Sequence, residues 1–173
     1  MQNTAAVPYF LTGNPETEEF ATTLYAKGQL GMFAEFDQGT PTARNICRYQ
    51  LVQQGSGIQA VVGSVLYWLS KSAKTVTTVR SGALAGVCQL ATANSNSFIW
   101  ICKSGRRSVK YQAAPTITPD TTGLPVVGSD STDGVADCLA LTETQGAFPL
   151  IGTSAGAAVA NVGLVDIDIP DND

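Results

Sequence analysis

Hydrophobic and polar residues alternate over short segments from residue 46 onward, and clusters of turn-forming residues separate these segments. Alternation with a period of two, bounded by Gly, Ser or Asn, is typical of β-strands. Residues 46–53 alternate in this way, and further strands are expected over the apolar run 58–69 and at 74–79 and 84–91. Their spacing predicts an antiparallel β-barrel or β-sandwich rather than alternating strands and helices.

The most hydrophobic segment is 98–102, which is apolar on both faces. We therefore expect a central strand that is covered from both sides. A turn at 105–107 is expected to lead into residues 108–112, which return beside that strand as a hairpin. Phe98 and Trp100 would suit a sugar-stacking platform, but in so hydrophobic a strand we interpret them as core residues.

The C-terminal part of the chain combines one long connection with three expected strands. Residues 113–134 are rich in Gly, Pro, Thr and Ser, which predicts a connection with at most one short strand, at 124–127. Further strands are expected at 136–141 and 148–151. Over 165–169 aliphatic residues alternate with aspartates, so the last strand should have one buried and one acidic face.

The N-terminal region, residues 1–43, is predicted to be an extended arm with a possible short helix at 15–25. Asn14 would cap that helix, and Pro15 suits its first position. Six aromatic residues are too many for a solvated tail, so we expect the arm to pack on its own domain or on a neighbouring subunit. The aromatic residues are Tyr9, Phe10, Phe20, Tyr25, Phe33 and Phe36. Residues 44–170 then form a single barrel or sandwich domain, and 171–173 a tail.

Composition supports a single domain with strands and turns and narrows the possible chemistry. The chain has 173 residues, of which only 14% are charged and 17 are Gly, and it contains 19 Thr. It contains no histidine, so the usual hydrolase triad, the Cys-His dyad and nearly every zinc site lack a member. Neither a membrane span nor a signal peptide is indicated. We expect no cofactor and no metal, and a protein that is not an enzyme.

Charge is distributed unevenly along the chain. All ten basic residues lie between Lys27 and Lys110, where only Glu35 and Asp37 oppose them, whereas nine acidic residues follow position 110. This pattern allows two interpretations: complementary faces that steer copies or a charged partner together, or charges that mix when the ends fold over the middle. We favour mixing.

The four cysteines, Cys47, Cys88, Cys102 and Cys138, stand far apart without a C-x-x-C pair. That spacing favours buried free thiols over a disulfide framework or a zinc site.

Two short motifs resemble enzyme signatures. Residues 152–156 read GTSAG and fit the serine hydrolase pattern G-x-S-x-G around Ser154, but no histidine or S-x-x-K motif exists to activate that serine. Residues 55–60 fit the loose dinucleotide pattern, but a strand-like run follows where a helix is required. We interpret both as turns. Two aspartate pairs, 133/137 and 166/168, could serve as glycosidase carboxylates, but we interpret Asp166 and Asp168 as solvated acids on the outer face of a strand.

Basic residues gather near the expected turn at 105–107. Arg106 and Arg107 stand there, with Lys103 and Lys110 nearby. A nucleic-acid site would need a broader positive face, and the pI is about 4.7. A solvated hairpin tip or a subunit contact is the interpretation that we favour.

The order of several short segments resembles the head decoration (cement) proteins of tailed bacteriophages and related virion proteins. The segments are RYQLV at 48–52, VLYW at 65–68, AGVC at 85–88, FIWICKSG at 98–105, IGTS at 151–154 and GLVDI at 163–167. The family pattern has R-Y-x-L-V, A-G-V-A and W-I-Q-x-x-G at the corresponding places. Cys88 and the pair Cys102-Lys103 depart from it, and the aromatic arm is not part of it.

The resemblance implies a β-barrel or sandwich that binds the outside of an icosahedral capsid and cements neighbouring major capsid subunits. It also implies a homotrimer on the virion surface, assembled in the bacterial cytoplasm, without nucleic-acid or membrane partners. The candidate capsid or subunit contacts are Tyr9, Phe10, Phe20, Tyr25, Arg106 and Arg107. A phage fibre, tail or host-surface-binding module is the alternative.

Overall fold

The computed structural model describes residues 16, 19–20, 30–40, 42–55, 59–80, 82–120, 122–140 and 149–171. Within these residues the helices and strands that the structure could contain are all β-strands, so the all-β prediction is confirmed. No helix in this part of the chain is long and apolar enough to span a membrane. The strands are β1 (Glu19–Phe20), β2 (Phe33–Asp37), β3 (Ile46–Gln54), β4 (Ala60–Val61), β5 (Val65–Ser70), β6 (Thr75–Thr77), β7 (Leu84–Cys88), β8 (Thr92–Ala93), β9 (Phe98–Lys110), β10 (Thr122–Gly128), β11 (Ala136–Cys138), β12 (Leu150–Ala155) and β13 (Val162–Asp168).

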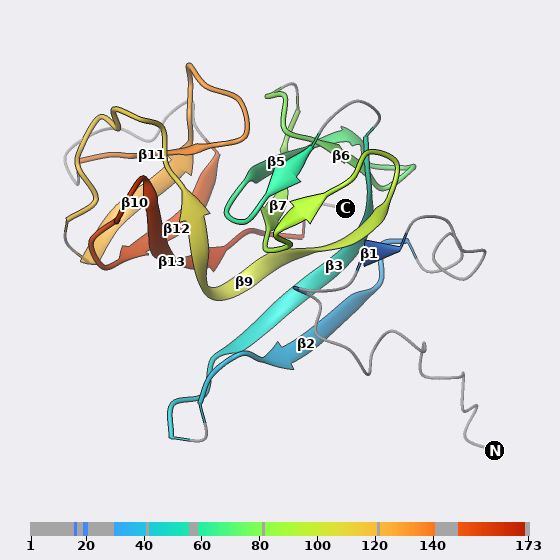
Figure 1. The fold of residues 1–173 in the computed structure, drawn as a ribbon, viewed down its shortest axis with the longest axis horizontal. Helices are drawn as coiled ribbons and strands as arrows, with labels where there is room; N and C mark the ends of the chain where they lie inside the picture. Colours follow the sequence, from blue (N-terminus) through green and yellow to red (C-terminus); the bar gives the residue numbers. More distant parts are fainter. Residues whose placement is uncertain are drawn as a thin grey trace.

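Five strands close into a barrel, in the order β3, β9, β7, β5, β6 and back to β3. The closing contact between β3 and β6 is parallel and pairs Gln53 with Thr75 and Gln54 with Val76. The other four contacts are antiparallel. Of the two architectures that the sequence left open, the structure therefore has the barrel, with further strands outside it (Figure 1).

Strand β9 connects the barrel to a second group of strands (Figure 1). Its first half pairs with β3 and β7, and from Ser104 to Lys110 it pairs with β13, after which the sheet continues through β12 and β10 to β11. The predicted hairpin of 98–102 with 108–112 is therefore wrong, because 98–102 and 108–110 belong to one strand. Gly105 lies inside this strand at φ +108°, a conformation that side-chain-bearing residues rarely adopt.

Alternate residues of the barrel strands face two separate hydrophobic clusters. On β9, Trp100 and Cys102 belong to one cluster, and Ile99 and Ile101 to the other. The cluster of Ile99 and Ile101 draws on all five barrel strands and on no strand of the β10–β13 group, so it fills the barrel interior. The cluster of Trp100 includes residues of β10 to β13 and therefore joins the barrel to the outer strands. Both faces of β9 are buried here, which confirms the prediction for 98–102.

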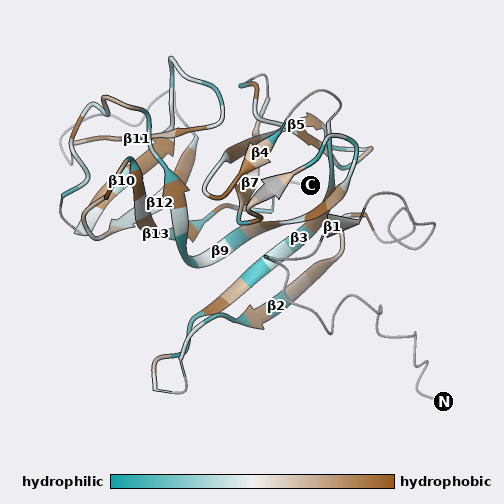
Figure 2. Ribbon diagram, in the orientation of Figure 1, coloured by the Kyte–Doolittle hydropathy of each residue, from teal (hydrophilic) through white to brown (hydrophobic). Residues whose placement is uncertain are grey.

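The β2–β3 hairpin projects away from the barrel, and its turn lies at the far end (Figure 1). Alternating hydrophobic and hydrophilic positions mark β3 along its length (Figure 2). Strand β2 falls in the region that the sequence assigns to the arm. At residues 19–20 the structure has β1, paired with β9, where the sequence predicts part of a helix. That part of the helix prediction is wrong, because these residues extend a sheet. Of the rest of 15–25, only Glu16 is described.

Three ion pairs join the basic middle of the chain to its acidic flanks: Arg107 with Glu16, Arg48 with Asp171, and Arg106 with Asp166. The interpretation that the charges mix on folding is therefore supported. The last strand also behaves as predicted, since Val165, Ile167 and Ile169 are buried while Asp168 is exposed.

Candidate protein-contact surface

Arg106 and Arg107 are neighbours on β9 and lie on opposite faces of the strand. The Arg106 guanidinium is half-exposed and donates two hydrogen bonds, of 2.7 and 2.9 Å, to the carboxylate of Asp166 on β13. This hydrogen bonding lowers the pKa of Asp166 and raises the pKa of Arg106. Of the two arginines, Arg106 is thus the one that faces outward, and the carboxylate of Asp166 neutralises its charge.

Arg107 points to the other face and contacts the N-terminal region. Its Nε lies 2.6 Å from Oε1 of Glu16 and 3.3 Å from the hydroxyl oxygen of Tyr49. The Tyr49 hydroxyl in turn donates a 2.7 Å hydrogen bond to Glu16. Burial raises the pKa of Tyr49, so it remains a proton donor in this cluster. Arg107 therefore ties the segment around Glu16 to the barrel.

The other predicted contact residues cannot be placed on this surface. Tyr9, Phe10 and Tyr25 lie outside the described residues, and for Phe20 only the backbone in β1 is described.

A row of exposed aliphatic side chains lies along the outward face of β13. Val159, Val162 and Leu164 are 76%, 37% and 47% exposed. Val159 and Val162 pair across a tight turn formed by Ala160 and Asn161, both at positive φ. Positive φ at both central positions is the geometry of the favoured two-residue hairpin turn, and it brings the two valines to the same face.

The pair of Asp166 and Arg106 continues this row, because Leu164 and Asp166 alternate with buried residues along β13. We call Val159, Val162, Leu164, Asp166 and Arg106 together the β13 face. Its apolar half was not predicted, because the expected last strand begins only at residue 165. Asn161, a residue that tolerates positive φ, was the available signal.

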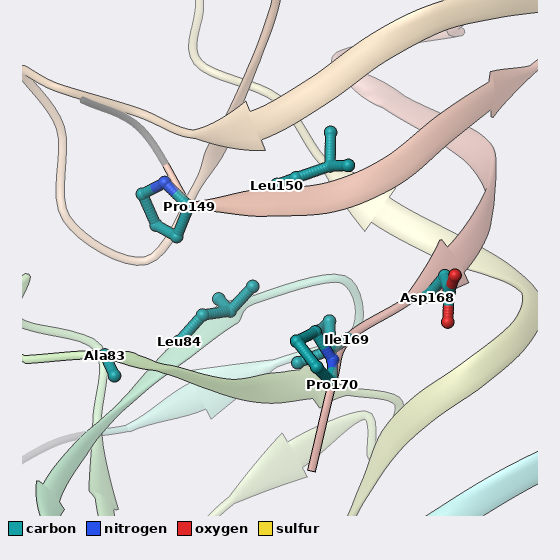
Figure 3. A pocket seen from close by; sticks show the side chains of 7 residues that line it. All are labelled: Ala83, Leu84, Pro149, Leu150, Asp168, Ile169 and Pro170. Carbon is teal, nitrogen blue, oxygen red and sulfur yellow. The ribbon is translucent and has the colours of Figure 1, made fainter. Parts of the chain in front are cut away.

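Two hollows border the end of β13. One, of about 480 Å³, lies beside the tip of the β2–β3 hairpin and is lined by residues that include Asn45, Ile46, Arg106 and Asp166. The other, of about 300 Å³, lies between the start of β7 and the β12–β13 strands (Figure 3). Its lining is Ala83, Leu84, Pro149, Leu150, Asp168, Ile169 and Pro170. Each is large enough for an inserted side chain of a partner protein.

The tip of the β2–β3 hairpin is held by a single carboxylate. Asp37 accepts hydrogen bonds from the backbone N–H groups of Asn45 and Gly39, at 2.9 and 3.0 Å, and from the Arg44 side chain at 2.9 Å. These donors, the N–H of Asn45 above all, lower the pKa of Asp37 to about 2. The Asn45 side chain also bonds the backbone of Arg106, so the tip is joined to the β13 face.

The residues of the enzyme-like motifs have structural partners. Ser154 lies in β12 and is buried, and its hydroxyl accepts a hydrogen bond from the backbone N–H of Leu124. Asp137 accepts hydrogen bonds from Thr116 and from the N–H of Cys138. Phe98 and Trp100 are fully buried, which confirms their prediction as core residues. In the part of the chain that the structure describes, no three His, Cys, Asp or Glu side chains converge as metal ligands.

No protein-family model matches the chain, and no curated protein matches its sequence. The fold is a closed five-stranded barrel with extra strands outside it, and the β13 face carries exposed aliphatic side chains on one of these outer strands.

Proposed function

We propose that this chain is a decoration protein of a tailed-phage head, which binds the outside of the icosahedral capsid and cements neighbouring major capsid subunits. In this proposal it acts as a homotrimer on the virion surface and has no catalytic role. The observation that carries the proposal is the β13 face, with three exposed aliphatic side chains beside a neutralised ion pair. The resemblance of the segment order to decoration proteins supports the same function.

The β13 face has the properties of a contact surface. Branched aliphatic side chains in a contiguous row gain free energy when a partner covers them, at about 25 cal/mol per Å² of apolar area. Strand β13 beneath is fixed by the buried side chains of its inner face, Val165 and Ile167, so little conformational freedom is lost on binding. Arg106 and Asp166 already neutralise each other, which suits them to the polar rim of such a contact.

A cement protein needs only modest affinity at each contact. Contacts repeated over a capsid lattice combine, because each bound contact raises the effective concentration of the next. The tip of the β2–β3 hairpin stands away from the barrel (Figure 1) and is joined to the β13 face through Asn45 and Arg106, so it extends the contact surface beyond that face.

The first experiment is a count of this chain in purified virus particles by quantitative mass spectrometry. An amount near that of the major capsid protein is expected for a shell-wide cement. A few to a few tens of copies would instead assign the chain to a fibre, tail or host-binding module. Absence from the particle would overturn both virion functions.

The second experiment tests the β13 face directly by adding the purified protein to capsids that lack it. Leu164→Asp places a charge in the aliphatic row and is expected to lower capsid occupancy at least about tenfold, since a buried charge costs more than 1.4 kcal/mol. Leu69→Asp is the matched control, because Leu69 is 59% exposed on β5, away from the β13 face. Equal binding by both variants, with circular dichroism spectra like the wild type, would exclude the β13 face as the contact.

A further inference from the structure

The smaller of the two hollows beside β13 lies where the barrel meets the outer strands (Figure 3). Its volume is about 300 Å³, and its lining is apolar except for one aspartate. Leu84 and Ile169 are buried beneath it, whereas Leu150, at the start of β12, is 40% exposed. Pro149 lies across the hollow from Leu84 and Pro170 (Figure 3). The hollow is therefore an open apolar slot that a single long side chain can enter.

Backbone hydrogen bonds hold the walls of this hollow in place. The carbonyl oxygens of Ala83 and Pro149 each accept a backbone N–H, at 2.9 and 3.1 Å. The N–H of Ile169 donates to the carbonyl oxygen of Lys103 at 2.9 Å. The hollow is thus formed before any partner arrives, which reduces the conformational entropy that binding costs.

Asp168 is the aspartate of the lining, and it stands at one end of the hollow (Figure 3). The aspartates on either side of it in the chain have cations: Asp166 pairs with Arg106, and Asp171 pairs with Arg48. Asp168 is exposed and forms no ion pair in the part of the chain that the structure describes. A carboxylate without a counter-ion beside an apolar slot is complementary to a side chain with an apolar stem and a cationic end.

The hollow also continues the β13 face. Asp168 follows Asp166 by two residues on the same strand, so both side chains lie on its outward side. A partner that covers Leu164 and the ion pair of Asp166 therefore also meets the hollow. Covering Asp168 without supplying a cation would leave its charge with neither water nor a counter-ion, which opposes binding.

We propose that the hollow binds a lysine or arginine side chain of the major capsid subunit. The aliphatic stem of that side chain lies between Leu84 and Pro149, and its cationic end binds the Asp168 carboxylate. This inference rests on the function proposed above and names the chemistry of the partner at one point of the contact. Long basic side chains bury their methylene groups on apolar surface while the charged end stays near water, which matches the exposed position of Asp168.

The test measures binding of the purified full-length protein to capsids that lack it. Asp168→Asn keeps the size of the side chain but removes its charge, and it is expected to weaken binding at least about threefold at low salt. High salt should weaken binding of the wild type towards that of the variant, because salt screens an exposed ion pair. Glu35→Gln is the matched control, since it removes one exposed carboxylate of β2, outside the hollow, and should bind like the wild type.

A second variant, Ala83→Phe, tests the apolar part of the hollow without a change of charge. Ala83 is an exposed residue of the lining, so a phenylalanine ring at this position can enter the hollow. Capsid binding is expected to fall at least about tenfold, because the ring excludes the side chain of the partner. Thermal unfolding verifies that each variant is folded, and Ala83→Leu replaces Ala83→Phe if the latter does not fold.

The outcomes separate this inference from the proposed function. If Leu164→Asp loses binding while Asp168→Asn and Ala83→Phe bind like the wild type, the β13 face is the contact and the proposal for the hollow is wrong. Loss with Ala83→Phe alone would mean an uncharged occupant, and loss with Asp168→Asn alone a cation that stays outside the hollow; either result overturns the proposal.

Two further results would overturn it for other reasons. If Asp168→Asn disrupts the homotrimer in sedimentation velocity, the cation comes from a second copy of this chain and not from the capsid subunit. If virus particles do not contain this chain, the proposed function fails and this inference fails with it.

Discussion

The ammonium group of Lys103 is buried and donates a 2.8 Å hydrogen bond to the backbone carbonyl oxygen of Ala85. A second carbonyl oxygen, that of Pro170, lies 3.4 Å from the same nitrogen. Lys103 follows the most hydrophobic segment of the chain, and its side chain joins β9 to β7 and to the residues after β13. Through the contact with the Pro170 carbonyl, the Lys103 side chain holds the segment after β13 against β7 and β9.

We therefore expect Lys103→Met to destabilise the protein although it preserves the apolar stem. Hydrogen bonds to a charged donor contribute about 1.5 to 3 kcal/mol, and methionine cannot donate. The free energy of unfolding in urea should fall by about 2 kcal/mol. The control is Lys110→Met on the exposed end of β9, which should leave it unchanged. Equal stability of the two variants would show that the hydrogen bonds of Lys103 contribute nothing to the free energy of unfolding.

The exchange of partners along β9 gives a second prediction, centred on Gly105. A Cβ atom there would lie 2.5 Å from the Cys47 sulfur and 2.9 Å from the Ile46 carbonyl oxygen, at φ +108°. Gly105→Ala should therefore combine backbone strain with overpacking and lower the free energy of unfolding by about 2 to 4 kcal/mol.

Gly123→Ala is the matched control, because Gly123 has φ +87° and nothing within 4 Å of its Cβ position. Gly123→Ala is expected to lower the free energy of unfolding by about 1 kcal/mol, from backbone strain alone. Chemical denaturation of both variants measures the difference. A loss at Gly105 no larger than that at Gly123 would contradict the contact with Cys47.

The same glycine shows why part of the fold could not be predicted from sequence. A Gly followed by two Arg residues is typical of a hairpin turn. Here the chain continues as one strand instead, because β9 pairs with β3 and β13, which are far away in the chain. Closure of the barrel is non-local too, since it depends on two residue pairs between β3 and β6. The alternation at 165–169 was predictable because a strand with one face to solvent records its burial pattern directly.

The contact surface was predictable only in part for a related reason. The expected turn at 105–107 hid the fact that consecutive residues of a strand point to opposite faces, so Arg106 and Arg107 were treated as one cluster. Val162 and Leu164 were missed because the turn before them contains no glycine.

The low pKa of Asp37 makes the hairpin tip sensitive to acid. A folded-state pKa of about 2, below the ordinary value of 3.8, means that Asp37 stabilises the folded protein above pH 4 and loses this contribution as the pH falls to 2. Asp37→Asn should lower stability at pH 6, and the difference from the wild type should shrink towards pH 2. Carboxyl NMR titration should place the Asp37 midpoint near 2. A midpoint near 4 would show that the hydrogen bonds from Asn45, Gly39 and Arg44 do not stabilise the ionised form of Asp37.

The opposite placement of Arg106 and Arg107 leads to a comparison of matched substitutions. Arg107→Met leaves Glu16 partly buried without its cation and removes a donor to Tyr49, so the free energy of unfolding should fall by about 1 to 3 kcal/mol. Arg106→Met breaks a solvent-screened pair on the β13 face and should change stability little. High salt should reduce the difference in the free energy of unfolding between Arg106→Met and the wild type. The difference between Arg107→Met and the wild type should persist, because salt screens partly buried ion pairs less. Urea denaturation of both variants at low and high salt measures these differences, and an equal loss of stability in the two variants would mean that Arg107 does not anchor the N-terminal segment.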